Sequence, residues 1–170
     1  VSHEIGAAGV WRDVPFLIAD NRTCYARRFL IAVLPGGGKA GTADGAVAWP
    51  EWADPLLSDI SKAAIADAGA ACADLLPDAA SRRFFCFPLA PPNGRIQIDG
   101  RSLGLPLALG FLSAAADARL PGDIAATGAV SAGGAVLPVG GMEVKRRASM
   151  DNGFPALLCP SENARLMAAK

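Results

Sequence analysis

The sequence predicts an α+β domain in which small mixed sheets pack with three or more helices. Three observations predict it. The chain has 170 residues, enough for one domain with a real core and too few for two ordinary ones. Apolar residues make up 52% of it, in segments of both strand-like and helix-like periodicity. These segments alternate without the strict strand–helix–strand rhythm of a parallel fold. We therefore treat residues 1–170 as a single domain.

The first half of the chain is expected to hold strands and one long helix. A turn at Asp20-Asn21 joins strands predicted at 16–19 and 24–34, and a short strand follows at 45–49. The helix is predicted to begin at Asp54, a good N-cap, with Pro55 in the first turn. Helical spacing of apolar residues continues from there until Pro77 ends the run.

In the second half of the chain, strands and helices are expected to alternate over shorter segments. Its predicted elements are a buried strand at 84–89, an apolar helix at 103–120, a hairpin at 123–139 that turns near 131–134, a helix at 142–152 and a strand at 156–159. Pro121 and Gly122 are expected to end the apolar helix, and Gly153 and Pro155 the one after it.

Composition and charge argue against several classes of function. Lys plus Arg and Asp plus Glu both number 16, and no long basic run occurs, so we expect no nucleic-acid partner. Apolar stretches are broken before membrane-spanning length, and the first residues do not resemble a signal peptide, so we expect no membrane partner. A G-x-G-x-x-G pattern at 36–41 is interpreted as a loop, because no helix pattern follows it directly.

Cysteine and histidine usage argues against a metal centre. Cys24, Cys72, Cys86 and Cys159 are widely separated and form no C-x-x-C pair. We interpret them as buried thiols in a reducing cytoplasm. His3 is the only histidine, so a Cys/His cluster of the usual kind cannot form and no metal ligands are expected.

Ser102 is the first candidate for chemistry. It lies in Asp99-Gly100-Arg101-Ser102-Leu103-Gly104, where a loop meets an apolar helix. Unpaired backbone N–H groups at a helix N-terminus can hold a developing oxyanion, and glycine lets a substrate backbone come close. From this segment alone, a helix-capping serine is the commoner interpretation.

A nucleophilic serine needs a base. His3 stands at the end of the chain, so a Ser–His–Asp triad is set aside, and a neutral lysine is the remaining common base. The chain offers four lysines: Lys39, Lys62, Lys145 and Lys170. Lys145 follows the Gly140-Gly141 turn on a short predicted helix and can point back toward a core. From the residues alone, a solvated lysine beside Arg146 and Arg147 remains the ordinary alternative.

Two segments together resemble a known family. DGRSLG, followed by a helix and then by TGAVSAGGAVLPVGGMEVK, is similar to the proteolytic domain of Lon, which carries D-G-P-S-A-G and T-G-x-[IV]-x-x-x-G-x-[VL]-x-P-[IV]-G-G-x-x-x-K. FPALLCPSEN further on resembles the family's G-x-x-x-V-x-x-P-x-x-N stretch. The likeness is clear over 84–163, weaker over 29–75 and not found over 1–28.

The resemblance implies the Lon proteolytic-domain fold and a Ser–Lys dyad of Ser102 and Lys145. Thr127 matches a threonine that hydrogen-bonds the lysine, and Asp99 matches the acidic residue that opens the serine motif. Backbone groups of 100–102 (Gly100, Arg101 and Ser102) would form the oxyanion site. The implied activity is that of a cytoplasmic serine endopeptidase that cleaves unfolded or damaged proteins by acyl transfer.

The resemblance also carries expectations about cofactors and partners. No cofactor is expected in this chain, and ATP would act only through an ATPase module that the chain does not contain. That module would lie upstream or act in trans, and the intact protein would form a hexamer. Protein or peptide substrates are the expected partners.

Two departures from the family pattern keep a second function open. Arg101 replaces the motif proline and Leu103 replaces its alanine. The alternative function is that of a catalytically latent binding or assembly module of a larger ATPase system. If the domain is active, Lys145 must be buried to lose its proton, and Leu103, Val136, Val139 and Met142 are expected to surround it. Arg101 is expected to pair with Asp99, which would keep that carboxylate away from Lys145.

Overall fold

A computed structural model describes residues 10–19, 24–35, 47–76, 82–89 and 98–169, and every structural statement below concerns these residues. Two features discussed above lie outside them: the turn at Asp20-Asn21 and the loop at 36–41 with its G-x-G-x-x-G pattern. No described helix combines the length and the apolar character needed to cross a membrane.

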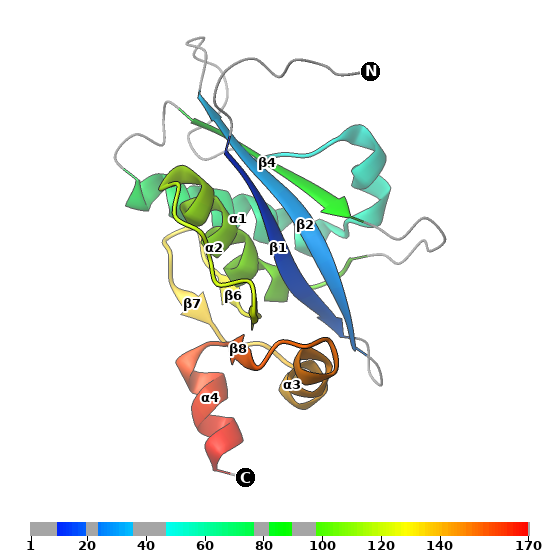
Figure 1. Cartoon of the computed structure of the whole chain (residues 1–170). Coiled ribbons are helices and arrows are strands. Elements are labelled where there is room, and N and C mark those ends of the chain that lie inside the picture. The colour runs from blue at the N-terminus through cyan, green and yellow to red at the C-terminus, as the bar shows by residue number, and fades with distance from the viewer. Residues whose placement is uncertain (1–9, 20–23, 36–46, 77–81, 90–97, 170) are drawn as a thin grey trace.

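The main sheet has six strands in the order β3-β4-β2-β1-β5-β8, with an antiparallel centre and parallel flanks (Figure 1). Its strands are β1 (Val10–Ala19), β2 (Cys24–Pro35), β3 (Val47–Ala48), β4 (Arg82–Leu89), β5 (Ile124–Ala126) and β8 (Ala156–Leu158). A second sheet pairs β6 (Ala129–Val130) with β7 (Val136–Leu137). Together with the helices, these mixed sheets confirm the α+β class.

Helices cover both faces of the central strands. The helical elements are η1 (Glu51–Leu56), α1 (Asp59–Leu75), η3 (Arg101–Leu103), α2 (Gly104–Ala115), α3 (Met142–Asp151) and α4 (Ser161–Ala168), η1 and η3 being 3₁₀ helices. α1 and α2 pack on one face of the sheet, whereas α3 lies beneath the tip of the β1–β2 hairpin (Figure 1).

Strand alternation decides which helix meets which residue. Successive side chains of a strand point to opposite faces of the sheet. Phe16 and Phe29 are buried against α1 and α2, with ring centroids 4.5 Å apart. Leu17, the next residue along β1, is buried on the other face with Ala148 of α3 and Phe154. Around Phe16 and Leu17, β1 therefore packs between the two helical layers.

The first long helix begins later than the sequence predicts. Asp54 is not its N-cap: that part of the chain is η1, and Leu57 is extended. Ser58 is the cap, and its side chain accepts a hydrogen bond from Ser61 N at 3.2 Å. The physical reason is tertiary, because Leu57 is buried and forms an isolated bridge with Ile98, far along the chain.

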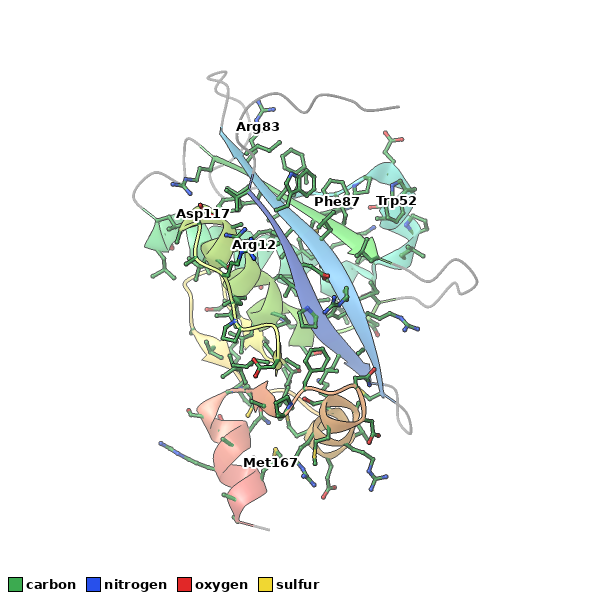
Figure 2. All side chains as sticks on the ribbon, in the orientation of Figure 1. Arg12, Trp52, Arg83, Phe87, Asp117 and Met167 are labelled. Atoms are coloured by element: carbon green, nitrogen blue, oxygen red, sulfur yellow. The ribbon has the colours of Figure 1, made fainter. Side chains whose placement is uncertain are left out.

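The apolar helix α2 ends before residue 120. Asp117 has φ 49°, a left-handed conformation that does not continue a helix. Arg12 of β1 fixes this end, because it donates to Ser113 Oγ at 3.1 Å and pairs with Asp117 at 2.8 Å (Figure 2). The stop therefore depends on a residue that lies about a hundred positions earlier, and Pro121 and Gly122 follow it in the chain.

The predicted hairpin at 123–139 is wrong in its first half. β5 leaves it and joins the main sheet, parallel to β1 and β8. Only β6 and β7 form a hairpin, whose turn Ser131 closes by donating its N–H to Ala135 O at 2.9 Å. The predicted elements at 142–152 and 156–159 are confirmed as α3 and β8, and α4 is an additional helix.

Candidate active site

Ser102 and Lys145 line one cavity of about 470 Å³ that is open to solvent. The serine segment forms one wall, and the chain from β7 into α3 forms another. Its lining residues are Asp99, Gly100, Arg101, Ser102, Ala129, Leu137, Pro138, Val139, Gly140, Gly141 and Lys145. Of the site residues that the sequence singles out, only Thr127 is absent from this lining.

The backbone around Ser102 is positioned by a glycine turn before it and by hydrogen bonds to Gly128. Gly100 precedes η3 with φ 110°, a region that favours glycine, and this conformation directs the chain into the 3₁₀ turn. Ser102 O accepts a hydrogen bond from Gly128 N at 3.0 Å, and Gly128 O accepts one from Leu105 N at 2.8 Å. The first N–H groups of a helical turn have no acceptor within it, so those of Arg101 and Ser102 can serve an incoming oxyanion.

The last position of the serine motif, Gly104, has no room for a side chain. A Cβ at this residue would lie 2.9 Å from Val130 N, a contact that real Cβ atoms essentially never make. The start of α2 therefore approaches the backbone of β6 closely. This approach keeps Ser102 next to the strand that continues into the opposite wall of the cavity.

Lys145 is buried although it carries an ionisable amine. It lies in the second turn of α3, which begins after Gly141 in a left-handed conformation (φ 68°), and it is 4% exposed. Burial lowers the pKa of the Lys145 ammonium because an apolar environment disfavours the charged form. A charge interaction with Cys24 raises that pKa and opposes the effect. No described carboxylate forms an ion pair with Lys145.

The apolar surround of Lys145 differs from the one predicted. Val136 is 48% exposed, and Met142 faces a separate cavity between α3 and α4. Leu103 is buried in the core beneath α1 and α2, and only Val139 lines the cavity with the lysine. The side of α3 that bears Ala148 is covered mainly by the β1–β2 hairpin, which is distant in the sequence.

Ser102 and Lys145 line the same cavity but do not interact with each other. Neither Ser102 Oγ nor Lys145 Nζ makes a hydrogen bond among the described residues, so the two are not bonded to each other. Thr127 is 1% exposed, and its Oγ1 has no hydrogen-bond partner within the described part of the chain. The bond from Thr127 to the lysine that the resemblance implies is therefore not formed in this structure. A buried hydroxyl without a partner costs about 1–3 kcal/mol, which favours a rearrangement that satisfies it.

The expected Arg101–Asp99 pair is wrong. Asp99 instead accepts a hydrogen bond from Ser58 Oγ at 2.6 Å, and Arg101 pairs with Asp67 of α1 at 2.5 Å. The two partners, Ser58 and Asp67, are placed by the way α1 packs beside the serine segment, which local spacing cannot reveal. The Arg101 side chain is half exposed, so its pair contributes only about 0–1 kcal/mol to stability.

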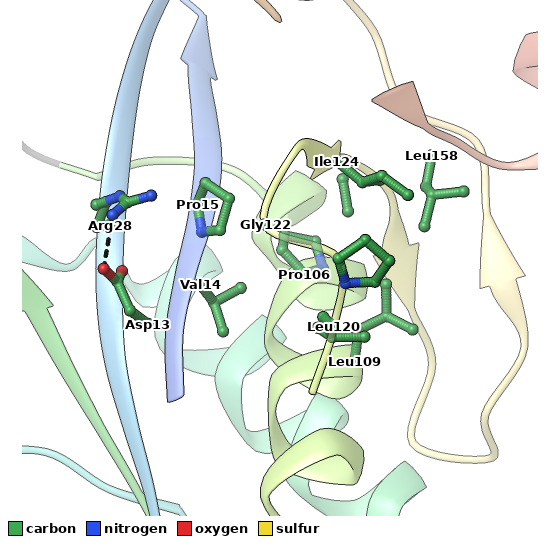
Figure 3. A pocket seen from close by; sticks show the side chains of 12 residues that line it. Asp13, Val14, Pro15, Arg28, Pro106, Leu109, Leu120, Gly122, Ile124 and Leu158 are labelled. Carbon is green, nitrogen blue, oxygen red and sulfur yellow. Dashed lines mark hydrogen bonds and ion pairs between the residues drawn. The ribbon is translucent and has the colours of Figure 1, made fainter. Parts of the chain in front are cut away.

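A smaller, better enclosed cavity of about 90 Å³ lies between β1, α2, β5 and β8 (Figure 3). Apolar side chains such as Val14, Leu109 and Ile124 line most of it, and the Arg28–Asp13 pair (2.7 Å) lies at its edge. Neither Ser102 nor Lys145 lines it. No group of His, Cys, Asp and Glu residues within the described part of the chain could hold a metal ion.

The sequence matches the family model of the Lon protease (S16) C-terminal proteolytic domain over residues 62–169, well over half of the chain. The chain belongs to this family. The match begins in α1 and includes η3, α2, α3 and α4, so both Ser102 and Lys145 fall within it.

Individual Lon proteases are similar over a shorter segment. Lon protease 2 of Borreliella burgdorferi is 38% identical over 74 residues, 44% of this chain and 9% of the relative. Lon protease of Clostridioides difficile is 39% identical over 71 residues, 42% of this chain and 9% of the relative. Lon protease of Rhizobium meliloti is 35% identical over 77 residues, 45% of this chain and 10% of the relative. The similar segment thus spans about a tenth of each relative.

Asn163 supports the wall of the cavity that Ser102 and Lys145 line, and the sequence assigns it no role. It lies on α4 and is 6% exposed. Its side-chain amide both donates a hydrogen bond to the backbone of Val139 and accepts one from it. Its Nδ2 donates to Val139 O at 2.9 Å, and Val139 N donates to its Oδ1 at 2.9 Å. The Pro160-Ser161-Glu162-Asn163 stretch that resembles the family was the available signal. Asn163 thereby fixes the wall that leads from β7 into the helix of Lys145.

Replacing Asn163 with aspartate should weaken both the fold and the cavity. The aspartate cannot donate to Val139 O, and two oxygens then face each other in a buried place. We expect a loss of about 1–3 kcal/mol in unfolding free energy and a lower kcat/KM. Urea denaturation and peptide hydrolysis measure the two effects. Asn152→Asp is the matched control, because Asn152 donates to Ala148 O from an exposed position; equal effects in both variants would contradict a role for the Asn163 bonds.

Proposed function

We propose that this chain is a serine endopeptidase domain in which Ser102 is the nucleophile and Lys145 the general base. The observation that carries the proposal is a buried lysine of lowered pKa that lines the same cavity as a serine in a 3₁₀ turn. Membership of the Lon proteolytic-domain family supports a serine-type peptidase. The assignment of the two residues is our own.

The proposed reaction is acyl transfer in two stages. Neutral Lys145 takes the proton of Ser102 as Oγ attacks the peptide carbonyl carbon. Backbone N–H groups of the 100–102 segment hold the oxyanion of the tetrahedral intermediate. Lys145 then gives its proton to the leaving amine, and the C–N bond breaks. Water, deprotonated by the same lysine, attacks the acyl-enzyme carbonyl carbon. The ester bond to Ser102 breaks, Oγ takes the proton back from Lys145, and the second product leaves as a carboxylic acid.

The lysine can act as a base only while it is neutral. Burial disfavours the ammonium, and the absence of a carboxylate partner among the described residues removes the usual force that would stabilise it. Thr127 would orient the amine by accepting one of its hydrogens, a role for which its unpartnered, buried Oγ1 is suited. Catalytic hydrogen bonds often tighten only when substrate is bound, so the unengaged dyad is compatible with this mechanism.

The properties of the intact protein extend the proposal. The relatives are named Lon protease, and by analogy we propose unfolded or damaged proteins as substrates. An ATPase module upstream or in trans and a hexameric assembly are proposed on the same analogy. The proposed chemistry needs no cofactor in this chain, and ATP would act only through that module. No disulfide joins the four cysteines, of which two are buried and two half-buried, and this is compatible with a cytoplasmic location.

A latent binding or assembly module is the second candidate. The observation that favours it is the lack of any hydrogen bond between Ser102 and Lys145, together with the unpaired Thr127. A latent module would keep the cavity and the fold but would never form the acyl-enzyme. The two candidates therefore differ in whether Ser102 reacts.

Labelling with a fluorophosphonate separates them. An activated serine displaces fluoride and becomes covalently phosphonylated, whereas an ordinary serine does not react at micromolar reagent. We expect one label per chain, mapped to Ser102 by mass spectrometry and lost in Lys145→Met. Hydrolysis of fluorescein-labelled unfolded casein should decline in parallel with labelling. An unlabelled and inactive wild-type chain would support the latent module.

A further inference from the structure

The side chain of Arg101 belongs to the cavity but has no part in the proposed reaction. Arg101 directly precedes Ser102, lines the same cavity, and has a side chain that is 51% exposed. Among the described residues that line the cavity, Lys145 is the other one that can carry a positive charge, and the proposed mechanism requires it to be neutral. A guanidinium stays protonated at any working pH. Arg101 is therefore the lasting positive charge of the described lining.

The ion pair of Arg101 leaves most of its guanidinium available. Arg101 Nη2 donates to Asp67 Oδ2 at 2.5 Å, so the contact joins one terminal nitrogen to one carboxylate oxygen. A guanidinium has five N–H donors in a flat fork, which can bind both oxygens of a carboxylate side by side. Because the side chain is half exposed, the pair with Asp67 is weak. The guanidinium can therefore also bind a second carboxylate that enters the cavity.

Asp99 is the negative charge of the described lining, and its carboxylate binds a different part of α1. Its Oδ1 accepts a hydrogen bond from Ser58 Oγ at 2.6 Å. Ser58 caps the start of α1, whereas Asp67, the partner of Arg101, lies about 13 Å further along the axis of that helix. The two side chains are thus held apart, and Asp99 does not neutralise the guanidinium.

We propose that Arg101 forms a subsite for a carboxylate side chain of the substrate, so that the chain favours peptides with Glu or Asp near the cleaved bond. Other described lining residues, such as Ala129, Leu137 and Val139, carry no charge. The substrate carboxylate binds the remaining N–H groups of the guanidinium while the peptide carbonyl lies at Ser102. The motif that the sequence resembles has proline in place of this arginine, so the subsite is particular to this chain. The inference rests on the proposed function and deepens it, because it names the class of substrate.

Peptides that differ only in Glu against Gln measure the preference. Mass spectrometry of digested casein first locates a cleaved bond, and fluorogenic peptides around that bond then carry Glu or Gln at each neighbouring position in turn. At the position that meets Arg101 we expect kcat/KM to be about three- to tenfold higher for Glu. Arg101→Gln should bring this ratio close to one, and a ratio within one variant does not depend on its general activity. A ratio near one at every position in the wild type, or one that survives Arg101→Gln, would overturn the proposal.

Two further variants separate the local charge from the overall charge of the chain. Arg147→Gln removes the same charge from an exposed position on α3 that does not line the cavity, so its Glu-to-Gln ratio should equal that of the wild type. Asp67→Asn removes the carboxylate that shares the guanidinium, so its ratio should rise. A preference that Arg147→Gln abolishes, or that Asp67→Asn fails to increase, would contradict a carboxylate subsite at Arg101.

Binding without hydrolysis separates failure of the inference from failure of the proposed function. In a Ser102→Ala chain, fluorescence anisotropy measures the binding of labelled casein peptides that contain Glu and of their Gln counterparts. Tighter binding of the Glu peptides that is lost when Arg101→Gln is added, in a chain whose wild type hydrolyses nothing, would support the subsite and reject the peptidase. Hydrolysis by the wild type without a difference between Glu and Gln would reject the subsite alone.

Discussion

Ser102→Ala is expected to lower hydrolysis of unfolded casein by about three orders of magnitude or more, because the proposed acyl-enzyme cannot form without Oγ. The fold should be retained, since the contacts of Ser102 that hold the segment use its backbone carbonyl. Initial rates at matched concentration measure the loss, and thermal unfolding verifies the fold. Ser161→Ala, at an exposed position at the start of α4, is the control and should remain fully active.

A variant that lacks both Ser102 Oγ and the Lys145 amine should lose little more activity than a variant that lacks one of them. Residues that act as a unit lose their joint effect with the first deletion, so Ser102→Ala with Lys145→Met should match the more damaging single variant. Additive losses would indicate that the two side chains act independently. A Ser102→Ala variant as active as wild type would show that the mechanism proposed above is wrong.

Lys145→Met is expected to abolish activity and to make the protein more stable. Burial lowers the lysine pKa, so the unfolded chain holds more protons than the folded one between the lowered value and the ordinary one. The free energy of unfolding therefore rises with pH over that window. Below the window the lysine is protonated in both states, and the folded chain carries the full cost of burying an ammonium. The gain from methionine should be largest at acid and neutral pH and should shrink toward pH ~10.

Thermal unfolding across a pH series measures this difference. Lys62→Met is the matched control, because Lys62 pairs with Asp54 near the surface and its replacement should bring no such pH-dependent gain. A Lys145→Met chain that is less stable than wild type at every pH would show that the lysine is well solvated or paired, and would remove the physical basis for a neutral base.

Local sequence was sufficient where neighbours along the chain decide the outcome. β2, β4, α3 and β8 lie close to their predicted positions, because the periodicity of apolar residues and the glycine and proline breaks determine them. β1 begins at Val10, six residues before the strand predicted at 16–19, because it pairs with β2 along its whole length. The serine segment and the lysine helix were also identifiable, since their motifs are contiguous. The resemblance to the Lon proteolytic domain depended on those same segments, and the family match over 62–169 bears it out.

Long-range contacts decided the rest. Burial of Leu57 against Ile98 delays α1 and moves its cap to Ser58, and Arg12 helps to end α2. Packing of α1 beside the serine segment gives Arg101 a partner in Asp67 in place of the expected Asp99.

By itself, the sequence determined the α+β class, the family and the two residues of the proposed dyad. Tertiary structure alone decided the electrostatic setting of Lys145: its 4% exposure, its charge interaction with Cys24 and the Asn163 bonds that fix the adjoining wall. The physical reason is that a side-chain pKa depends on burial and on nearby charge, and both are supplied here by strands and helices distant in the chain.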